Sequence, residues 1–246
     1  MTHDDTQSLP QMLPLGQDGV LVRFGDGYRA APQVAQAFGD AVRRSDLRGV
    51  TEIATSLAST LIRFRPDVVT RAGLTAHLQG LIDDDSAQAA VDPARLWTIP
   101  ACFGGDAGPQ LSEAADLAGL SVAEAITALT TTEVSVLAIG FAPGQPYLGL
   151  LPQVWDMPRQ RDLTPQVPAG ALVVALRQLV LFANPSPTGW RWIGSCAFAP
   201  FRADRAEPFA LRAGDRIRFV ETDAASIAAL RDDADGLGGA TCEDRA

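Results

Sequence analysis

The sequence of 246 residues has only two histidines, His3 and His77, and they are far apart. Neither has a second His or Cys at ligand spacing, so we expect no metal site. A Ser-His-Asp or Cys-His nucleophile would need one of these same histidines, and no G-x-S-x-G motif occurs. The sequence therefore argues against both a metal centre and a familiar hydrolytic triad.

Basic charge is also scarce. Twenty Lys and Arg residues stand against 29 Asp and Glu residues, for a net charge of −9. A nucleic-acid backbone or an anionic membrane needs a basic surface, so we expect neither as a partner. The N-terminal stretch MTHDDTQSLP lacks the basic and apolar regions of a signal peptide, and no apolar run approaches the roughly 18 residues of a membrane span. We therefore expect a cytoplasmic protein.

Cysteine and nucleotide-binding motifs are sparse as well. The three cysteines are widely spaced and form no CxxC pair, and we interpret Cys102 and Cys196 as apolar filling and Cys242 as part of a loose tail. No G-x-x-x-x-G-K-[ST] loop occurs, and the GLGG of the tail follows no credible strand. ATP, if it binds, needs an unfamiliar site.

The first part of the chain alternates between helical and extended patterns. The order runs from the strand GVLVRFG to the helix PQVAQAFGDAVRR, the strands VTEIAT and STLIRFR, the helix VVTRAGLTAHLQGLI and the strand ARLWTIP. This β-α-β-β-α-β order predicts a ferredoxin-like (split βαβ) domain over residues 12–100. The acidic, small-residue stretch at 83–94 is the candidate linker or exposed loop.

The second part changes to mostly extended runs. A short helix should follow Pro109, and in LSVAEA a capping box between Ser121 and Glu124 predicts the start of the next helix. From Glu133 onward, short apolar runs broken by Pro and Gly predict a small β-barrel or sandwich. We assign residues 101–222 to this domain and residues 223–246 to a flexible tail.

Three loops combine many glycines and prolines: FAPGQPYLGLLP, TPQVPAG and NPSPTGWRWIG. Proline restricts φ and glycine permits close backbone approach, so such loops can present fixed backbone groups to an anion or to a flat polar ligand. The alternative is that they are only tight corners of a barrel. Positive charge nearby comes from four arginines, Arg159, Arg161, Arg177 and Arg191.

Seven motifs, in chain order, carry a family resemblance: PLGQDGVLVRFGD, IPACFGGDAGPQL, LSVAEAI, IGFAPGQPYLGLLP, VPAGALVV, SPTGWRWIG and LRAGDRIRFV. Together they resemble the allophanate hydrolase subunit 1 family, also called the KipI or PxpB family, from residue 12 to about residue 221. The resemblance implies an α+β domain followed by a cyclophilin-like β-barrel. It also implies a C-type cyclophilin-like partner subunit that shares the active site, and an A-type third subunit in 5-oxoprolinase complexes.

The function that the resemblance implies is that of the B-type subunit of an ATP-dependent 5-oxoprolinase-like amidohydrolase, with a small amide substrate and with ATP and Mg²⁺ as co-substrate of the complex. Alternatives are a non-catalytic regulatory subunit of the KipI kinase-inhibitor type and a carboxyltransferase subunit of a urea carboxylase or allophanate hydrolase system. No catalytic residue is identified. The loops and the resemblance give these candidate substrate- or nucleotide-binding residues: Pro143, Gly144, Tyr147, Gly149, Pro168, Gly170, Arg177, Gln178, Ser186, Gly189 and Trp190.

The chain departs from the family's motifs at several polar positions. Gln145 replaces an aromatic residue, and the arginines of the T-P-R and I-G-R motifs are replaced by Gln166 and Ser195. Leu179 stands where the family has the threonine of Q-T-G. We expect these changes to weaken the binding of anionic ligands unless Arg161, Arg177 or Arg191 reaches the site. We also expect Gly144 and Gly170 to serve close approach to a ligand or partner.

Overall fold

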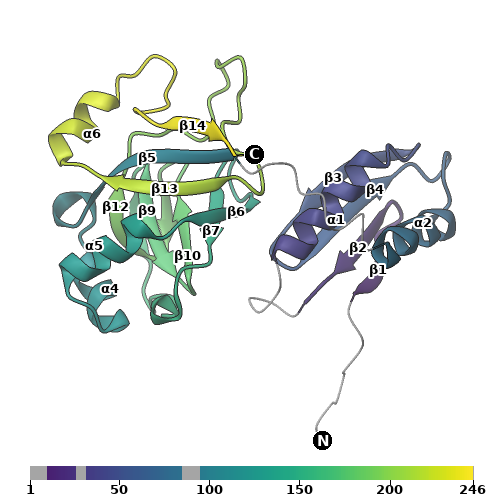
Figure 1. Cartoon of the computed structure of the whole chain (residues 1–246), viewed down its shortest axis with the longest axis horizontal. Helices are drawn as coiled ribbons and strands as arrows, with labels where there is room; N and C mark the ends of the chain where they lie inside the picture. Colours follow the sequence, from purple (N-terminus) through teal and green to yellow (C-terminus); the bar gives the residue numbers. More distant parts are fainter. Residues whose placement is uncertain (1–9, 26–31, 85–94, 246) are drawn as a thin grey trace, which may run out of the picture. The chain divides into compact units, whose positions relative to one another are not determined.

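The computed structural model describes residues 10–25, 32–84 and 95–245. The chain divides into two compact units, residues 1–92 and residues 93–246 (Figure 1). Within the described residues, no helix is long and apolar enough to cross a membrane.

The N-terminal unit is one antiparallel sheet with two helices. Its sheet has the strand order β1-β2-β4-β3. Buried and less buried residues alternate along β2 and β4, so the inward side chains of these strands pack against apolar residues of both helices. The core of this unit consists of Val20, Val22, Phe38, Val42, Ile62, Phe64, Leu74 and Leu78. The elements are β1 (Gln11–Leu15), β2 (Gly19–Arg23), α1 (Pro32–Arg44), β3 (Val50–Thr55), β4 (Ser59–Phe64) and α2 (Arg71–Asp83).

The predicted ferredoxin-like order is not confirmed. The strand expected to complete it, β5 (Arg95–Phe103), lies in the second unit, and the strand at the sheet edge beside β2 is β1. Strand β5 joins the other sheet because Trp97, Ile99 and Ala101 pack in the core of that unit. The predicted boundary at residue 100 therefore falls inside a strand. Most of the predicted linker, residues 85–94, lies outside the described residues.

The second unit is built on a closed β-barrel, as the sequence predicts, and the barrel fits a cyclophilin-like domain. Strand β5 pairs in parallel with β13 on one side and antiparallel with β12 on the other, which closes the sheet. The seven strands run around the barrel in the order β5, β12 (Arg191–Ser195), β9 (Ala171–Ala175), β10 (Gln178–Leu181), β7 (Pro146–Gly149), β6 (Val134–Ile139) and β13 (Arg216–Glu221).

Shorter elements surround the barrel. The predicted capping box is present, since Ser121 Oγ accepts from the Glu124 backbone N–H at 3.2 Å and Glu124 Oε2 accepts from that of Ser121 at 2.8 Å. The elements are η2 (Gly105–Ala107), α4 (Leu111–Ala118), α5 (Val122–Thr131), η3 (Gln153–Trp155), β8 (Thr164–Val167), β11 (Ser186–Thr188), α6 (Ala224–Leu230) and β14 (Thr241–Asp244).

The expectation of a flexible tail is wrong for residues 223–245. Asp223 caps α6 by accepting from the Ser226 backbone N–H at 2.7 Å, and Ile227 is buried. Strand β14 then pairs antiparallel with β5 (Figure 1). The cap between Asp223 and Ser226 is a local signal that the sequence analysis missed, whereas strand β14 depends on long-range pairing with β5.

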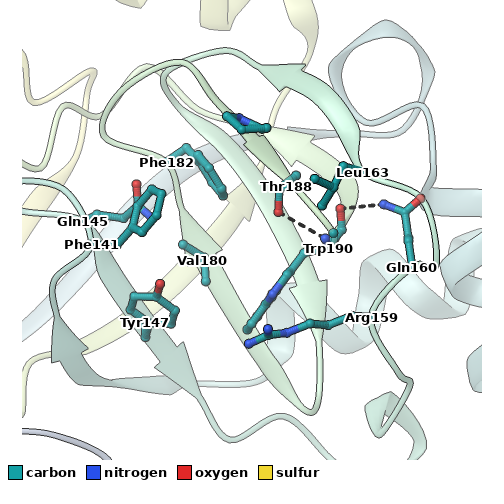
Figure 2. A pocket seen from close by; sticks show the side chains of 12 residues that line it. Phe141, Gln145, Tyr147, Arg159, Gln160, Leu163, Val180, Phe182, Thr188 and Trp190 are labelled. Atoms are coloured by element: carbon teal, nitrogen blue, oxygen red, sulfur yellow. Dashed lines mark hydrogen bonds between the residues drawn. The ribbon is translucent and has the colours of Figure 1, made fainter.

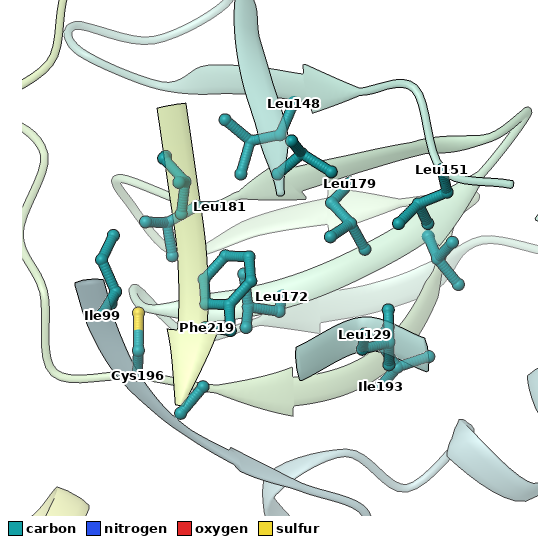
Figure 3. Close-up of a cluster of buried hydrophobic side chains, with 14 of the residues drawn as sticks. Ile99, Leu129, Leu148, Leu151, Leu172, Leu179, Leu181, Ile193, Cys196 and Phe219 are labelled. Carbon is teal, nitrogen blue, oxygen red and sulfur yellow. The ribbon is translucent and has the colours of Figure 1, made fainter. Parts of the chain in front are cut away.

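Strand β10 shows how the barrel wall is buried on both faces. Leu179 and Leu181 point into the barrel and join its hydrophobic core (Figure 3). Val180 and Phe182 belong to a separate cluster on the outer face. This is why the run reads as continuously apolar instead of alternating.

Candidate functional site

A cavity of about 340 Å³ lies on the outer face of the barrel wall. Its floor comes from β7 and β10. One wall comes from the loop before β7, and the opposite wall comes from the segment before β8, strand β11 and the corner between β11 and β12 (Figure 2). The residues that line it are Phe141, Gln145, Tyr147, Arg159, Gln160, Leu163, Val180, Phe182, Pro187, Thr188, Gly189 and Trp190.

Aromatic rings form much of the cavity surface. The ring centroids of Tyr147 and Trp190 are 6.2 Å apart with the planes inclined at 76°, an edge-to-face arrangement. The guanidinium of Arg159 lies over the Trp190 ring, 5.6 Å from its centroid, while the Arg159 side chain stays exposed. The site thus offers flat apolar surfaces with one cation at the edge.

The corner that carries Trp190 is held by Gln160. Gln160 Nε2 donates to the Trp190 carbonyl oxygen at 2.9 Å, and its backbone N–H donates to the Gly189 carbonyl oxygen at 2.7 Å. Gln160 Oε1 accepts from Gln110 Nε2 at 2.6 Å. Since both ends of this amide are engaged, Gln160 positions the corner and has little capacity left for a ligand.

Thr188 keeps a donor for a ligand. Its Oγ1 accepts from the Trp190 backbone N–H at 3.1 Å, which leaves the hydroxyl proton free to donate elsewhere. Thr188 is buried and lines the cavity. Together with Arg159 it gives this wall two hydrogen-bond donors.

The opposite wall carries Gln145 behind a tight turn. The Gln145 backbone N–H donates to the Ala142 carbonyl oxygen at 3.1 Å, and Gly144 adopts φ +72° within that turn. Phe141 also has a positive φ, and 75% of it is exposed at the cavity rim. Gln145 is 1% exposed, and its Oε1 is buried without a hydrogen-bond partner. An unpaired buried acceptor is costly, so this oxygen is a candidate ligand contact.

Of the predicted binding residues, Tyr147, Gly189 and Trp190 line this cavity. Pro143 and Gly144 belong to the turn that precedes Gln145, and a Cβ on Gly144 would come within 2.6 Å of the Phe201 Cβ. Gly144 therefore serves packing at this turn.

The other predicted glycines and their neighbours also have structural surroundings. Gly170 has φ +83°, and a Cβ there would overlap the Cys196 carbonyl oxygen. Pro168 begins the turn before β9, where its carbonyl oxygen accepts from the Ala171 backbone N–H at 3.2 Å. Gly149 and Ser186 sit in strand pairs with Gln178 and Val167, outside the cavity lining.

Gln178 and Arg177 lie at the turn between β9 and β10, also outside the cavity lining. Gln178 is 1% exposed, with its Nε2 buried and unpartnered. Arg177 donates to the Leu151 carbonyl oxygen at 2.9 Å and to Gln153 Oε1 at 3.1 Å. These contacts tie Arg177 to the neighbouring loop.

Arg191 does not reach the cavity either. It is buried, pairs with Glu113 at 2.8 Å and donates to the Pro158 carbonyl oxygen at 2.7 Å. Two of the noted sequence departures also lie elsewhere: Leu179 is in the barrel interior, and Ser195 donates to the Ala107 carbonyl oxygen at 2.8 Å. Those departures therefore do not alter this cavity directly.

Several lining residues were missed as binding candidates. Val180 and Phe182 could have been found from the period of two along β10, once the register of its turn was known. No sequence signal marked Gln160 or Leu163, because the segment before β8 has no periodic pattern. In the described ranges 10–25, 32–84 and 95–245, no three His, Cys, Asp or Glu side chains gather where they could hold a metal ion.

Comparison with known sequences identifies relatives over most of the chain. Residues 10–211 match the family model described as carboxyltransferase domain, subdomain C and D. The chain is 30% identical over 220 residues to the 5-oxoprolinase B subunit of Bacillus subtilis (strain 168), in a match that covers 85% of this chain and 92% of that protein. It is 35% identical over 136 residues to the 5-oxoprolinase B subunit of Escherichia coli O157:H7, covering 55% and 62% of the two chains.

Solved structures show the same fold. A crystal structure of TTHA0988 matches with a TM-score of 0.70 and 31% identity, over 83% of this chain and 40% of that chain, so this chain spans about two fifths of it. The urea amidolyase of K. lactis shares the fold with a TM-score of 0.69 at 14% identity, over 95% of this chain and 16% of that one. The family match and the 5-oxoprolinase relatives show that this chain belongs to the carboxyltransferase domain, subdomain C and D, family, which includes the B subunits of 5-oxoprolinase.

Proposed function

We propose that this chain is the B-type subunit of an ATP-dependent 5-oxoprolinase-like amidohydrolase complex, and that the cavity beside Trp190 binds a small cyclic amide. The names of its relatives support the reaction class. The cavity supports the ligand class, because about 340 Å³ suits a small molecule and the Tyr147 and Trp190 rings can cover the faces of a small ring. Arg159 can pair with a carboxylate on that ring.

The donors of the Thr188 wall fit the chemistry of amide opening. When water adds to the carbonyl carbon of a lactam, negative charge grows on the carbonyl oxygen, and fixed donors in a dry site stabilise it until the C–N bond breaks and the carbonyl reforms. The Thr188 hydroxyl is buried and held by the Trp190 backbone, so it is oriented before a ligand arrives. Its role would be to hold the amide oxygen while Arg159 holds an acidic group.

The same cavity does not fit the triphosphate of ATP. Among its twelve lining residues there is one cation, Arg159, whereas a triphosphate needs several cations or a cluster of backbone donors. These residues therefore do not support phosphoryl transfer. In the proposed complex, ATP and its Mg²⁺ would bind at a surface to which another subunit contributes.

The observation that carries this proposal is the apolar rim of the cavity. Phe141 and Leu163 line it and are 75% and 67% exposed, although covering a large apolar side chain is worth about 1.5–3 kcal/mol. A C-type cyclophilin-like subunit that packed on these two residues would bury them and close the cavity. The binding site would then be shared between two subunits.

Reconstitution tests the proposal. We expect the purified chain alone to hydrolyse neither ATP nor 5-oxoproline, and the complex with its C-type and A-type partners to release glutamate in the presence of ATP. The double variant Phe141→Ser, Leu163→Ser should weaken partner binding while the chain still folds, because both side chains are exposed. Robust turnover by the isolated chain would rule out a shared site.

A regulatory subunit of the KipI kinase-inhibitor type is the second candidate. It is favoured by the structural contacts of Arg177 and Arg191, which leave Arg159 as the single cation in the cavity lining. A complex that assembles and binds a cyclic amide, yet releases no product with ATP present, would favour this alternative. Turnover of urea in place of 5-oxoproline would instead favour the carboxyltransferase alternative.

A further inference from the structure

We propose that Gln145 sets the ligand specificity of this cavity by accepting a hydrogen bond from an amide N–H of the ligand. The cavity would then select lactams with a free ring N–H over ring esters and N-alkylated lactams of the same shape. This inference rests on the proposed function, because it assumes that the cavity binds a small cyclic amide.

The unpaired oxygen of Gln145 is the main observation. Gln145 is 1% exposed, lines the cavity, and keeps Oε1 buried without a hydrogen-bond partner. Its backbone is fixed at both polar groups, since its N–H donates to Ala142 at 3.1 Å and its carbonyl oxygen accepts from Gly140 at 3.0 Å. The side chain therefore projects from a rigid turn, and its acceptor oxygen has no hydrogen-bond partner within the protein.

The polar groups on the two walls of the cavity would orient a bound ligand. Figure 2 shows Gln145 and Phe141 on one side of the cavity, Thr188 and Arg159 on the other, and Val180 between them. A rotation of the Gln145 amide about its last side-chain bond would turn Oε1 toward the wall that carries the donors. A lactam has the matching polarity, because its N–H and its carbonyl oxygen are on adjacent ring atoms and can address acceptor and donor groups at once.

The rejection of analogues follows from the same oxygen. A ring ester places an oxygen where the lactam has its N–H, so two acceptors would face each other, and an N-methyl group would leave Gln145 Oε1 buried and unpaired. The flanking side chains of Phe141 and Phe182 carry no donor that could satisfy it instead. A site that loses one such contact discriminates by about tenfold or more.

The experiment titrates the full-length chain with three neutral probes, 2-pyrrolidone, N-methyl-2-pyrrolidone and γ-butyrolactone, and with 5-oxoproline, by saturation-transfer NMR. We expect the wild-type chain to bind 2-pyrrolidone about tenfold more tightly than either analogue. Gln145→Met should bring the three affinities together, and Gln145→Glu, which keeps an acceptor oxygen, should retain the preference. Gln178→Met is the matched control: it removes another buried amide that does not line the cavity, and it should leave the preference unchanged.

The outcomes separate this inference from the proposed function. Equal affinities in the wild-type chain, or a preference that survives Gln145→Met, would overturn the role of Gln145 while leaving a cyclic-amide site in place. Binding of none of the four probes, either by the chain alone or by its complex with the C-type partner, would overturn the proposed ligand class together with this inference. A thermal unfolding curve for each variant shows whether a lost preference reflects lost folding.

Discussion

The inner and outer faces of the barrel wall are both buried, yet they differ in chemistry. On the inner face, Leu179 and Leu181 of β10 join a hydrophobic core of aliphatic and aromatic side chains. On the outer face, Val180 of the same strand and Phe182, which directly follows the strand, border a cavity with aromatic rings and one cation. The unpartnered Gln145 Oε1 also belongs to the outer side.

This difference indicates that one face of a strand contributes to stability while the other face contributes to a binding site. The inner core packs hydrophobic side chains closely and so contributes stability, although it also contains a buried polar atom without a hydrogen-bond partner, the Nε1 of Trp155. The outer face accepts an unpaired amide oxygen and an incompletely filled space, both of which cost stability. Such costs are expected where a ligand or partner completes the site. Substitutions on the inner face should therefore change stability, and substitutions on the outer face should change binding.

The largest effect should come from Leu179→Ala on the inner face. Leu179 is 1% exposed, and a Leu→Ala cavity in a core costs about 2–5 kcal/mol of unfolding free energy. Urea unfolding followed by tryptophan fluorescence measures it, because all four tryptophans lie in the barrel unit. Val154→Ala, at a 49% exposed position, is the control and should change stability by less than about 0.5 kcal/mol. A similar loss of unfolding free energy in both variants would contradict a closely packed inner core around Leu179.

Two glycine variants should separate packing from binding. Gly170→Ala should destabilise the barrel unit by about 1–3 kcal/mol, because of its φ of +83° and the clash with the Cys196 carbonyl oxygen. Gly189→Ala should fold normally, since its Cβ would lie 3.5 Å from the Leu163 side chain, but its methyl group would narrow the cavity and weaken binding of 2-pyrrolidone. Unfolding curves and NMR titrations of both variants measure these effects. If the Gly170→Ala chain were fully stable but bound 2-pyrrolidone weakly, Gly170 would contribute to ligand binding and not to packing.

The fold could be predicted where the pattern is local. The Ser121 capping box needs only residues within one helical turn, and the short runs after Glu133 predicted a barrel because Gly and Pro mark their ends. The sequence could not predict which sheet β5 joins. The apolar pattern of β5 suits the core of either unit, and only its long-range pairing with β12 and β13 determines the sheet. Strand β1 was missed for a related reason: QMLPL contains proline and is half exposed at a sheet edge.

The site could be predicted only in outline. The glycine and proline loops marked Tyr147, Gly189 and Trp190, and the structure places all three in the lining of one cavity. They also marked Gly170, whose special backbone serves a close approach to Cys196, because a glycine signal does not say what approaches it. Arg159 came from counting nearby charge, but the same count gave Arg191, which is buried against Glu113. The sequence did not indicate in which direction each arginine side chain points, and so could not distinguish Arg159 from Arg191.

A smaller effect should appear at high pH through Cys196, which belongs to the inner core. Burial raises the pKa of this thiol from the ordinary value of 9.0 to about 12. Above pH 9 the unfolded chain releases this proton while the folded chain retains it, so stability falls as the pH rises from 9 to about 12. At pH 10 the loss should be about 1.4 kcal/mol relative to pH 8. Urea unfolding at both pH values should show this loss in the wild type and a smaller one in Cys196→Ala; equal losses would place a titrating group elsewhere.

The smallest effect concerns the two arginines whose roles the structure distinguishes. Arg159→Ala should weaken 5-oxoproline binding only roughly threefold to fivefold, because the guanidinium is exposed over Trp190 and its attraction for a carboxylate is screened by water. Binding of uncharged 2-pyrrolidone should hardly change, which separates charge from packing. Arg177→Ala should alter neither affinity, since its contacts are to Leu151 and Gln153. Titrations of the two variants with both probes give four affinities. A larger loss from Arg177→Ala than from Arg159→Ala would place the carboxylate at the turn between β9 and β10, and the binding site would then extend beyond the Trp190 cavity.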